Sequence, residues 1–483
     1  MRHTSQRRRS LASRGVYPLA LLSLYLGSCE SAVNPPFAPS SAEAPTSNAS
    51  AFASTSSADG GASSDRFDTR KPRNAIIFIG DGMGVSTVTA GRIYAGQKRG
   101  VDGESFELAW EDFPQLALVK TYNHDAQVPD SAGTATALLS GFRARIGQIN
   151  VPPREYPPTL PARERFSCDT DALRPTLLGR AKAANRRVGV VSTARLTHAT
   201  PAAVYGYAAD RGFEAPADLP PEARAAGCTS LSEQLAAAPL DLAMGGGARE
   251  FSSVDTSSYS SADDLDALEL PALGLFADSH MAYEADRAGT GEPSLAEMTV
   301  AAIRALDGDD GYVLVAEAGR IDHAHHATNA FRALEDLDAL HEAVAAAKAL
   351  VGEDTLLLVT ADHSHVFTMQ GYPARGNPIL GLVQGLDADS RERATTVELA
   401  DDQKPYTTLS YANGPVLRDE VDFSQAQRPD FRQPAGMRLG SETHGGEDVA
   451  LYAVGPGADA FGGVMDQPEV GQALWEVLDL QNH

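Results

Sequence analysis

Short apolar runs rich in β-branched residues alternate with longer periodic segments over most of this chain. The runs predict strands at residues 74–80, 186–193, 312–319, 355–362 and 449–456. The longer segments predict helices, among them residues 174–185, 294–306 and 329–350. Near-continuous apolar strands separated by helices are typical of parallel strands buried on both faces. The pattern therefore predicts an α/β fold with a mostly parallel central sheet flanked by helices on both faces.

Polar side chains that can bind metal or phosphate stand at or just beyond the ends of several predicted strands. Asp81 follows the first strand, His198 comes after the second, Glu317 lies near the end of the third, and Asp362 and His363 end the fourth. Ligands of open α/β sheets bind beyond the carboxyl ends of the strands. We therefore expect these side chains to share one site.

The stretch VPDSAGTATALLSG, residues 128–141, places an acid and a hydroxyl at the start of a predicted helix. Pro129 cannot lie inside a helix, whereas Asp130 and Ser131 suit its first positions. The free N–H groups and macrodipole of a helix N-terminus favour an anion such as phosphate, and the small residues that follow allow close approach. An ordinary helix cap is the alternative interpretation of Ser131 taken alone.

Histidine and aspartate gather in AEAGRIDHAHHATNA, residues 316–330. If the segment from Asp322 is helical, Asp322 and His326 stand four apart on one face and can bind one metal ion, while His323 and His325 point elsewhere. A solvated histidine cluster is the alternative. His444 lies in a glycine-containing turn before the last strand, and it is a further candidate ligand.

The glycines of IFIGDGMGVS, residues 77–86, do not form a dinucleotide-binding motif. Their spacing is G-x-G-x-G, and Val85 stands where the third glycine of G-x-G-x-x-G belongs. Asp81, in this glycine-flanked turn, is better placed as a carboxylate that bridges metal ions.

The chain is strongly acidic, with 40 Lys and Arg against 64 Asp and Glu and a net charge of −24 over 483 residues. Binding to nucleic acid depends on Lys and Arg that neutralise phosphates, so this balance argues against it. A phosphate substrate needs local positive charge at its site, which metal ions can supply.

The first residues indicate export. Residues 1–28 join a basic segment to a short apolar run and end in LGS, so LGSC resembles a bacterial lipobox with Cys29 lipidated. An ordinary cleaved signal peptide is the alternative. Residues 29–70 are rich in Ser, Ala and Pro and predict a disordered tether. We expect an exported protein, periplasmic or at the cell surface, held to a membrane by lipid.

Cys168 and Cys228 are the remaining cysteines. In an oxidising compartment such a pair can form a disulfide, and we predict that it does. Two separately buried free thiols are the alternative.

Six motifs together resemble the alkaline phosphatase family and follow one another in the family's order. They are IFIGDGMG, VPDSAGTATA, TARLTHATPAA, EAGRIDHAHH, VTADHSHVF and THGGEDVALY, within residues 74–456. His198 and His323 occupy two positions that separate the animal enzymes from the best-known bacterial form, and the chain resembles the animal branch there.

The resemblance implies phosphate monoester hydrolysis with two Zn²⁺ ions and one Mg²⁺ ion as cofactors. It implies that Ser131 is the nucleophile that becomes phosphoserine and that Arg211 clamps the phosphate; the motif around Arg211 is short, and Arg224 lies nearby. The implied ligands of the first zinc are Asp322, His326 and His444. Those of the second are Asp81, Asp362 and His363, with Ser131. Those of magnesium are Asp81, Thr200 and Glu317, with His198 and His323 in its outer shell.

By the same resemblance, residues 71–483 form the catalytic domain, residues 371–440 form a crown-like insertion, and the protein is a homodimer. A phosphodiesterase or sulfatase of the same superfamily is one alternative function, although the chain lacks a sulfatase-type Cys/Ser-x-Pro-x-Arg motif. A non-catalytic lipoprotein that binds zinc or phosphate, or a purely structural surface protein, is another. Such proteins do not need a nucleophile, so Ser131 favours the enzyme.

Overall fold

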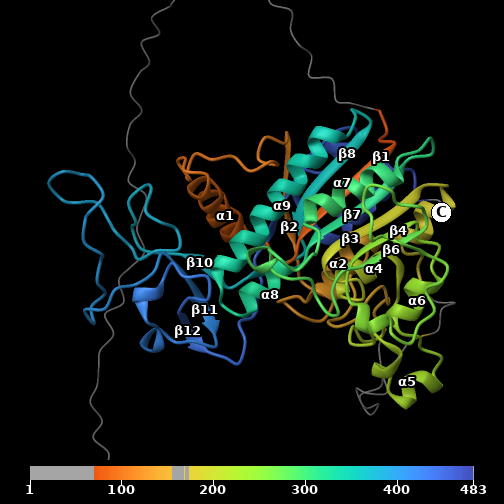
Figure 1. Ribbon diagram of the computed structural model, residues 1–483, viewed down its shortest axis with the longest axis horizontal. Helices are drawn as coiled ribbons and strands as arrows, with labels where there is room; N and C mark the ends of the chain where they lie inside the picture. Colours follow the sequence, from red (N-terminus) through yellow and green to blue (C-terminus); the bar gives the residue numbers. More distant parts are fainter. Residues whose placement is uncertain (1–69, 155–167, 169–172, 482–483) are drawn as a thin grey trace, which may run out of the picture. The chain divides into compact units, whose positions relative to one another are not determined.

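The predicted strands belong to one ten-stranded sheet in the computed structural model (Figure 1). The structure describes residues 70–154, 168 and 173–481, so the predictions for residues 1–28, for Cys29 and for nearly all of the tether lie outside the described residues. The strands of the sheet are β1 (Asn74–Gly80), β2 (Gln115–Lys120), β3 (Arg187–Arg195), β4 (Leu242–Gly246), β5 (Ser260–Ser261), β6 (Ala272–Leu275), β7 (Tyr312–Ala318), β8 (Thr355–Ala361), β14 (Val449–Val454) and β15 (Gly463–Asp466).

The strand order is β15-β2-β14-β8-β1-β7-β3-β4-β6-β5. Strand β14 runs antiparallel to its neighbours β2 and β8, and the other pairs of the sheet are parallel. Every residue of β1, β7 and β8 is buried, as their continuous apolar sequence predicts for strands covered on both faces. The predicted α/β class and mostly parallel sheet are confirmed.

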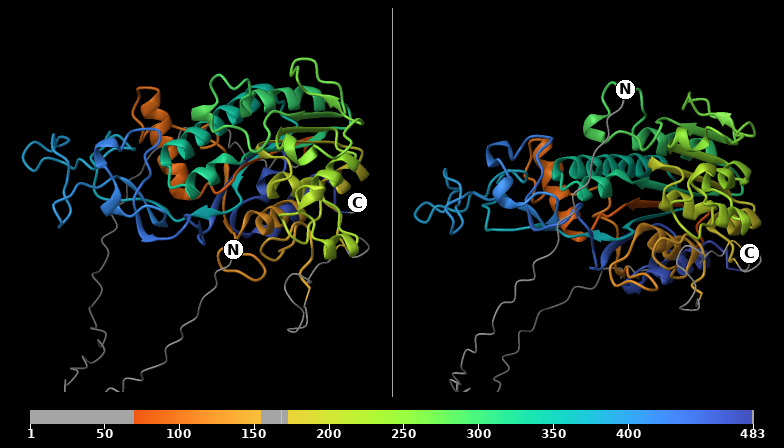
Figure 2. Two further views of the ribbon diagram at one scale, coloured as in Figure 1. Left: turned by 60° about the horizontal axis from the view of Figure 1, so that its bottom comes forward. Right: turned by 90° about the horizontal axis from the view of Figure 1, so that it is seen from below.

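Helices cover both faces of the sheet (Figure 2). On one face lie α7 (Leu295–Leu306) and α9 (Ala330–Leu350), with α1 (Val85–Lys98) packed against α9. On the other lie α2 (Ser131–Ser140), α3 (Leu177–Ala183), α4 (Ala199–Tyr205) and α10 (Gln467–Val477). The remaining α-helices of the described residues are α5 (Pro221–Ala225), α6 (Leu231–Ala237) and α8 (Arg320–His326). None of the helices in the described part of the chain is long and apolar enough to span a membrane.

A smaller sheet lies beside the main one, formed by β10 (Phe367–Met369), β11 (Leu409–Gly414) and β12 (Ala435–Arg438). Its Phe367, Leu409 and Tyr411 join a separate apolar cluster with residues of α1 and α9. Residues 371–440, predicted as the crown-like insertion, contain β11, β12 and long loops. Two very short strands, β9 (Ser364–His365) and β13 (His444–Gly445), pair antiparallel and bring two histidine-containing segments together.

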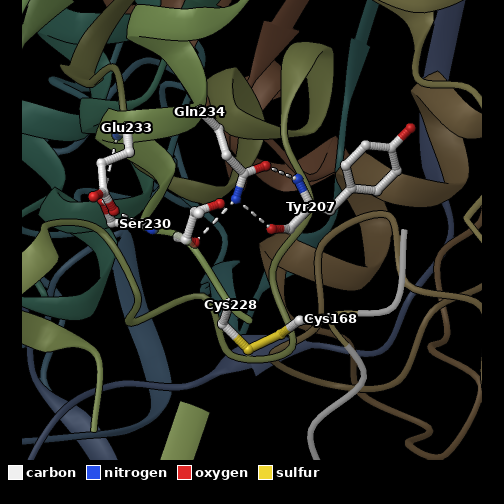
Figure 3. The surroundings of a disulfide bond; sticks show 7 residues. Cys168, Tyr207, Cys228, Ser230, Glu233 and Gln234 are labelled. Atoms are coloured by element: carbon white, nitrogen blue, oxygen red, sulfur yellow. Dashed lines mark hydrogen bonds between the residues drawn. A yellow bond between two sulfur atoms is a disulfide. The ribbon is translucent and has the colours of Figure 1, made fainter. Parts of the chain in front are cut away.

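A disulfide joins Cys168 and Cys228, as predicted, with 5.1 Å between their Cα atoms (Figure 3). Cys228 is buried beside Leu219 and Ala223. Nearby, the side chain of Gln234 bonds to the backbone of Tyr207 in both directions, at 2.8 Å each, and links α6 to the segment after α4.

Candidate active site

The register of three central strands brings the predicted carboxylates together. Gly80, the last residue of β1, pairs with Ala361 on one side and Ala318 on the other, so Asp81 and Asp362 leave adjacent strands side by side. Glu317 is one residue earlier in β7, and it is buried completely. The turn after β1 is closed by glycine: Gly82 has φ +70°, and its N–H donates to Asp362 Oδ1 at 3.0 Å. The sheet edge thus carries the site that the strand ends predict.

Helix α2 places Ser131 against these groups. Asp130 is the N-cap, and its side chain accepts a hydrogen bond from Gly133 N at 3.1 Å. Ser131 is the first helical residue and is 2% exposed. Gly133 leaves room for Asn123, whose Oδ1 would lie 2.3 Å from a Cβ at that position. Gly133 therefore allows Asn123 to pack closely against the helix N-terminus.

Ser131 forms a tight set with the three residues predicted for the second zinc. Its Oγ lies 3.1 Å from His363 Nε2 and 3.5 Å from Asp81 Oδ1. His363 Nε2 in turn lies 3.4 Å from Asp81 Oδ1 and 3.5 Å from Asp362 Oδ2. Zinc holds N and O ligands at about 2.0–2.2 Å in tetrahedral geometry, so the ligand atoms of one site lie ~3.3 Å apart. These four atoms fit that spacing.

The residues predicted for the first zinc form an equally tight set. His326 Nε2 lies 3.4 Å from Asp322 Oδ1, His444 Nε2 lies 3.3 Å from it, and the two nitrogens are 3.1 Å apart. Asp322 and His326 do stand on one face of α8, as the spacing predicts. His323 and His325 point elsewhere, and His325 Nδ1 is 2.8 Å from Tyr411 Oη.

The three histidines predicted to bind zinc have their ring orientation set by backbone carbonyls. His326 Nδ1 contacts Glu442 O at 2.7 Å, His444 Nδ1 contacts Pro129 O at 2.8 Å, and His363 Nδ1 contacts Ser364 O at 3.3 Å. A carbonyl can only accept, so each Nδ1 carries the proton and each Nε2 keeps a lone pair for a metal. This arrangement is typical of metal-binding histidines.

The residues predicted for magnesium present buried oxygen atoms without a well-formed hydrogen bond among the described residues. Asp81 Oδ2, Thr200 Oγ1 and Glu317 Oε1 are buried, and no hydrogen bond of good geometry reaches them from the described residues, although the Thr200 side chain lies close enough to the Glu317 carboxylate to lower its pKa. Asp81 and Glu317 also form a possible metal-binding group with His198. Buried polar atoms normally have partners, and an all-oxygen donor set suits Mg²⁺. The chemistry of all three sets therefore fits the metals that the sequence predicts.

Three carboxylates of the site, those of Asp81, Asp362 and Glu317, are costly to ionise, whereas hydrogen bonds from His365 and His444 hold the pKa of Asp322 well below its usual range. Burial raises the pKa of Asp81 well above its usual range, and the neighbouring Asp362, Asp322 and Glu317 raise it further. Burial also raises the pKa of Asp362, and it raises that of Glu317 to about 7. Bound cations remove this cost, so the charge pattern also favours metal binding.

Arg211 is placed beside Ser131, and Arg224 is not. Arg211 Nη1 donates to Asp130 Oδ2 at 3.1 Å, and its Nη2 donates to His198 Nε2 at 3.0 Å. Arg224 lies on α5 and bonds to the backbone of Leu219 at 3.3 Å. The structure thus separates the two arginines that the sequence leaves as candidates for the phosphate clamp.

Comparison with known proteins agrees with this geometry. A family model described as alkaline phosphatase matches residues 72–270 and 260–480. The human tissue-nonspecific alkaline phosphatase is 38% identical over 460 residues, covering 85% of this chain and 84% of the relative. An alkaline phosphatase of Gadus morhua is 35% identical over 466 residues, which cover 85% of this chain and 93% of the relative.

The chain belongs to the alkaline phosphatase family. The crystal structure of Thermus thermophilus alkaline phosphatase has the same fold, with a TM-score of 0.61, 24% identity, and coverage of 86% of this chain and 93% of that one. The alkaline phosphatase from the Antarctic bacterium TAB5 also has this fold, with a TM-score of 0.58 and 21% identity. The match covers 85% of this chain and 99% of that one. The predicted family and its animal-type relatives are confirmed, and the chain is a phosphoric monoester hydrolase with metal cofactors.

Beside the sites of this alkaline phosphatase, His280 joins the two histidines predicted for the outer shell of magnesium. Its ring centroid is 4.1 Å from that of His323 and 5.4 Å from that of His198. His280 lies in LFADSHM, which carries none of the six motifs, so sequence reasoning missed it. Burial lowers the pKa of His198 well below its usual range and that of His323 to about 4, so the cluster is neutral.

Sequence reasoning also missed His365 and Glu442. His365 Nε2 lies 2.9 Å from Asp322 Oδ1, and His365 Nδ1 lies 2.6 Å from Glu442 Oε2. Burial lowers the pKa of His365, but the two hydrogen bonds outweigh burial and raise the pKa to about 9. Its ring nitrogens face Asp322 and Glu442, and His365 also belongs to possible metal-binding groups, one with Asp322, His363 and His444 and one with His326 and Glu442. The signal was present in ADHSH, where His365 follows His363 by two residues.

Proposed function

We propose that the enzyme hydrolyses phosphate monoesters through a phosphoserine at Ser131, releasing the alcohol and then inorganic phosphate. The observation that carries this proposal is the position of Ser131 Oγ, 3.1 Å from His363 Nε2 at the N-terminus of α2 and beside the Asp130–Arg211 pair. A nucleophile, a helix N-terminus and an arginine that converge on one point suit a phosphoryl group.

Each residue has a defined role in this proposal. Ser131 loses its hydroxyl proton to solvent and its Oγ attacks phosphorus, while the ester oxygen leaves with its electron pair and takes a proton from water to become the alcohol. Water later cleaves the phosphoserine and restores the serine hydroxyl. Arg211 binds two phosphoryl oxygens with its planar fork, which a lysine cannot do. Asp130 holds Arg211 and caps the helix whose N–H groups face the anion. Phosphoryl transfer depends on such positioning and charge stabilisation more than on acid and base groups.

The proposed cofactors are two zinc ions and one magnesium ion. The first zinc would be held by Asp322, His326 and His444. The second would be held by Asp81, Asp362, His363 and Ser131. Magnesium would be held by Asp81, Thr200 and Glu317, with His198 and His323 outside them. When bound, these cations lower the pKa of the serine hydroxyl and neutralise charge on the phosphoryl oxygens.

The experiment that tests the function compares p-nitrophenyl phosphate with bis-p-nitrophenyl phosphate at alkaline pH, using protein loaded with zinc and magnesium. We expect a large preference for the monoester that Ser131→Ala removes and Ser140→Ala, at the far end of the same buried helix, retains. A diester preference would favour a phosphodiesterase of the superfamily. Metal binding with no turnover would favour a non-catalytic zinc- or phosphate-binding lipoprotein.

We further propose that the enzyme is a homodimer that uses the crown-like insertion. Large apolar side chains are exposed on this segment: Tyr372 is 89% exposed, Leu386 57% and Leu399 50%. Exposed apolar groups clustered on one segment suit an interface. Light scattering at micromolar concentration should give twice the mass of the chain, and a monomeric mass contradicts the proposal.

We also propose that the protein is exported and lipid-anchored at Cys29, at the cell surface or in the periplasm. The support is the basic and apolar sequence that ends at LGSC and the Ser-, Ala- and Pro-rich segment after it. Wild-type protein should fractionate with membranes and incorporate labelled fatty acid. Cys29→Ala should abolish both, and unchanged labelling in that variant rules the anchor out.

A further inference from the structure

Glu442 occupies an unusual position for an acidic residue. It lies two residues before His444, and it is 1% exposed. One carboxylate oxygen, Oε2, accepts from His365 Nδ1 at 2.6 Å, and the other, Oε1, accepts from Val366 N at 2.9 Å. A buried carboxylate is costly unless it is fully hydrogen-bonded, and both of these oxygens are bonded.

The hydrogen bonds of Glu442 reach two of the residues predicted for the first zinc by different routes. Its backbone N–H donates to His326 O at 3.1 Å, and its C=O accepts from His326 Nδ1 at 2.7 Å. Its side chain instead holds His365, whose opposite ring nitrogen donates to Asp322 Oδ1 at 2.9 Å. The backbone therefore orients His326, with the carboxylate Oε2 a further 3.6 Å from His326 Nδ1, and the carboxylate acts on Asp322 through His365.

This second route fixes the ring orientation of His365 and, through it, the direction of the Asp322 carboxylate. Because a carboxylate only accepts, His365 Nδ1 must carry a proton toward Glu442, and the imidazole plane is then set by two bonds on opposite edges. At the end of this series of hydrogen bonds, Asp322 Oδ1 accepts from His365 Nε2. The same oxygen lies 3.3–3.4 Å from the Nε2 atoms of His326 and His444. A small rotation of the His365 ring would move or release that oxygen.

We propose that Glu442 is a positioning residue for the first zinc, acting through His365 to hold Asp322 in its ligating orientation. This inference rests on the proposed function, because it assumes that Asp322, His326 and His444 bind zinc. Outer hydrogen-bond partners of metal ligands commonly change metal affinity by about 10–100-fold when they are removed. A buried acid that merely anchors Val366 would have no such effect.

Glu442→Gln is the informative substitution, because it keeps the size of the side chain and all backbone contacts to His326. The amide puts an NH2 group where one carboxylate oxygen stood, so either His365 Nδ1 or Val366 N, which bond to different oxygens, then faces a donor instead of an acceptor. The matched control is Glu447→Gln in the same segment. Glu447 is exposed, and its Oε1 accepts from Ser364 Oγ at 2.7 Å, so it contacts neither Asp322 nor His365 in the described hydrogen bonds.

The measurement is the rate at which zinc leaves the loaded protein when a chromophoric chelator is in excess, with the total zinc content determined at the start. We expect one of the two zinc ions to leave Glu442→Gln at least tenfold faster than it leaves wild-type protein or Glu447→Gln. With Co²⁺ in place of Zn²⁺, the visible spectrum of that one site should change in Glu442→Gln alone, which reports ligand orientation directly.

His365→Asn gives an independent variant if Glu442→Gln folds poorly. Both substitutions break the same series of hydrogen bonds, which runs from Glu442 through His365 to Asp322. The double variant should therefore release zinc no faster than the more affected single variant. Release from Glu442→Gln within twofold of wild type, or effects that multiply in the double variant, overturns the inference while leaving the proposed function intact. Wild-type protein that binds no zinc and hydrolyses no monoester overturns both.

Discussion

Arg211 and Asp130 form an ion pair, 3.1 Å from Nη1 to Oδ2, directly beside Ser131. The contact is reinforced through Gly147, whose N–H donates to the same Asp130 oxygen at 3.0 Å and whose C=O accepts from Arg211 N at 2.7 Å. The cap of the nucleophile's helix therefore also positions the arginine predicted to bind the phosphoryl group. The carboxylate of Asp130 therefore both caps the helix and holds Arg211.

Replacing Arg211 by alanine should weaken the binding of phosphate. Hydrogen bonds to charged groups contribute about 1.5–3 kcal/mol, so we expect KM for p-nitrophenyl phosphate and Ki for inorganic phosphate to rise on the order of 10–100-fold. Arg211→Lys keeps the charge without the fork and should recover only part of the loss. Arg224→Ala is the control and should leave steady-state kinetics unchanged. Equal effects of the Arg211 and Arg224 changes contradict the assignment.

Substitutions of Asp130 should separate its two roles. Asp130→Ala removes the helix cap as well as the ion pair, so it should reduce the free energy of unfolding by about 1 kcal/mol and raise Ki for phosphate. Asp130→Asn can still cap α2 but cannot form an ion pair with Arg211. We expect it to preserve the thermal melting temperature while raising Ki several-fold. A lower melting temperature in Asp130→Asn with unchanged Ki would show that the residue is purely structural.

The strand ends of the site could be predicted because a simple rule links sequence to position. Asp81 and Asp362 follow buried apolar runs, and parallel strands deliver their carboxyl ends to one edge. Asp322 and His326 followed from helical spacing alone. The assignment of individual ligands to individual metals came from the family resemblance, because spacing does not show which side chains face one another across strands.

The contacts that the sequence did not predict join segments that are far apart in the sequence and meet only in the folded protein. Glu442 reaches His365 across 77 residues because β13 pairs with β9, strands of two residues each that no hydrophobic pattern marks. His280 lies beside His323 because the loop after β6 returns to the edge of the sheet. The family resemblance implied Arg211 as the phosphate clamp on a short motif, and tertiary contacts to Asp130 and His198 set it apart from Arg224.

The disulfide should contribute substantially to stability. It links residues 60 apart, and the loss of chain entropy in the unfolded state gives an upper value of about 4 kcal/mol. Cys168→Ala with Cys228→Ala should therefore lower the melting temperature and leave KM unchanged, because neither residue contacts the predicted metal ligands. Reducing agent should lower the melting temperature of wild-type protein and leave that of the double variant unchanged. A double variant as stable as wild type would contradict this.

Metal removal should make stability depend on pH through Glu317. Burial raises the pKa of Glu317 to about 7 from 4.5, so in metal-free protein the folded state holds a proton that the unfolded state has released between these values. Folding then becomes less favourable as pH rises through this window, and the full cost is present above about pH 7. Bound cations offset the same charge, so metal should stabilise the protein more at pH 8 than at pH 5.

Glu317→Gln isolates this contribution, because glutamine does not titrate and the other groups of the site remain. In EDTA, the melting temperature of Glu317→Gln minus that of wild type should be near zero at pH 5, increase through pH 7 and then stay constant. We expect a final difference of about 2–5 °C by differential scanning calorimetry. With magnesium and zinc present the sign should reverse, since the variant loses a carboxylate ligand. A difference independent of pH in EDTA would mean that Glu317 is ionised throughout and that its burial is compensated by a partner other than a cation.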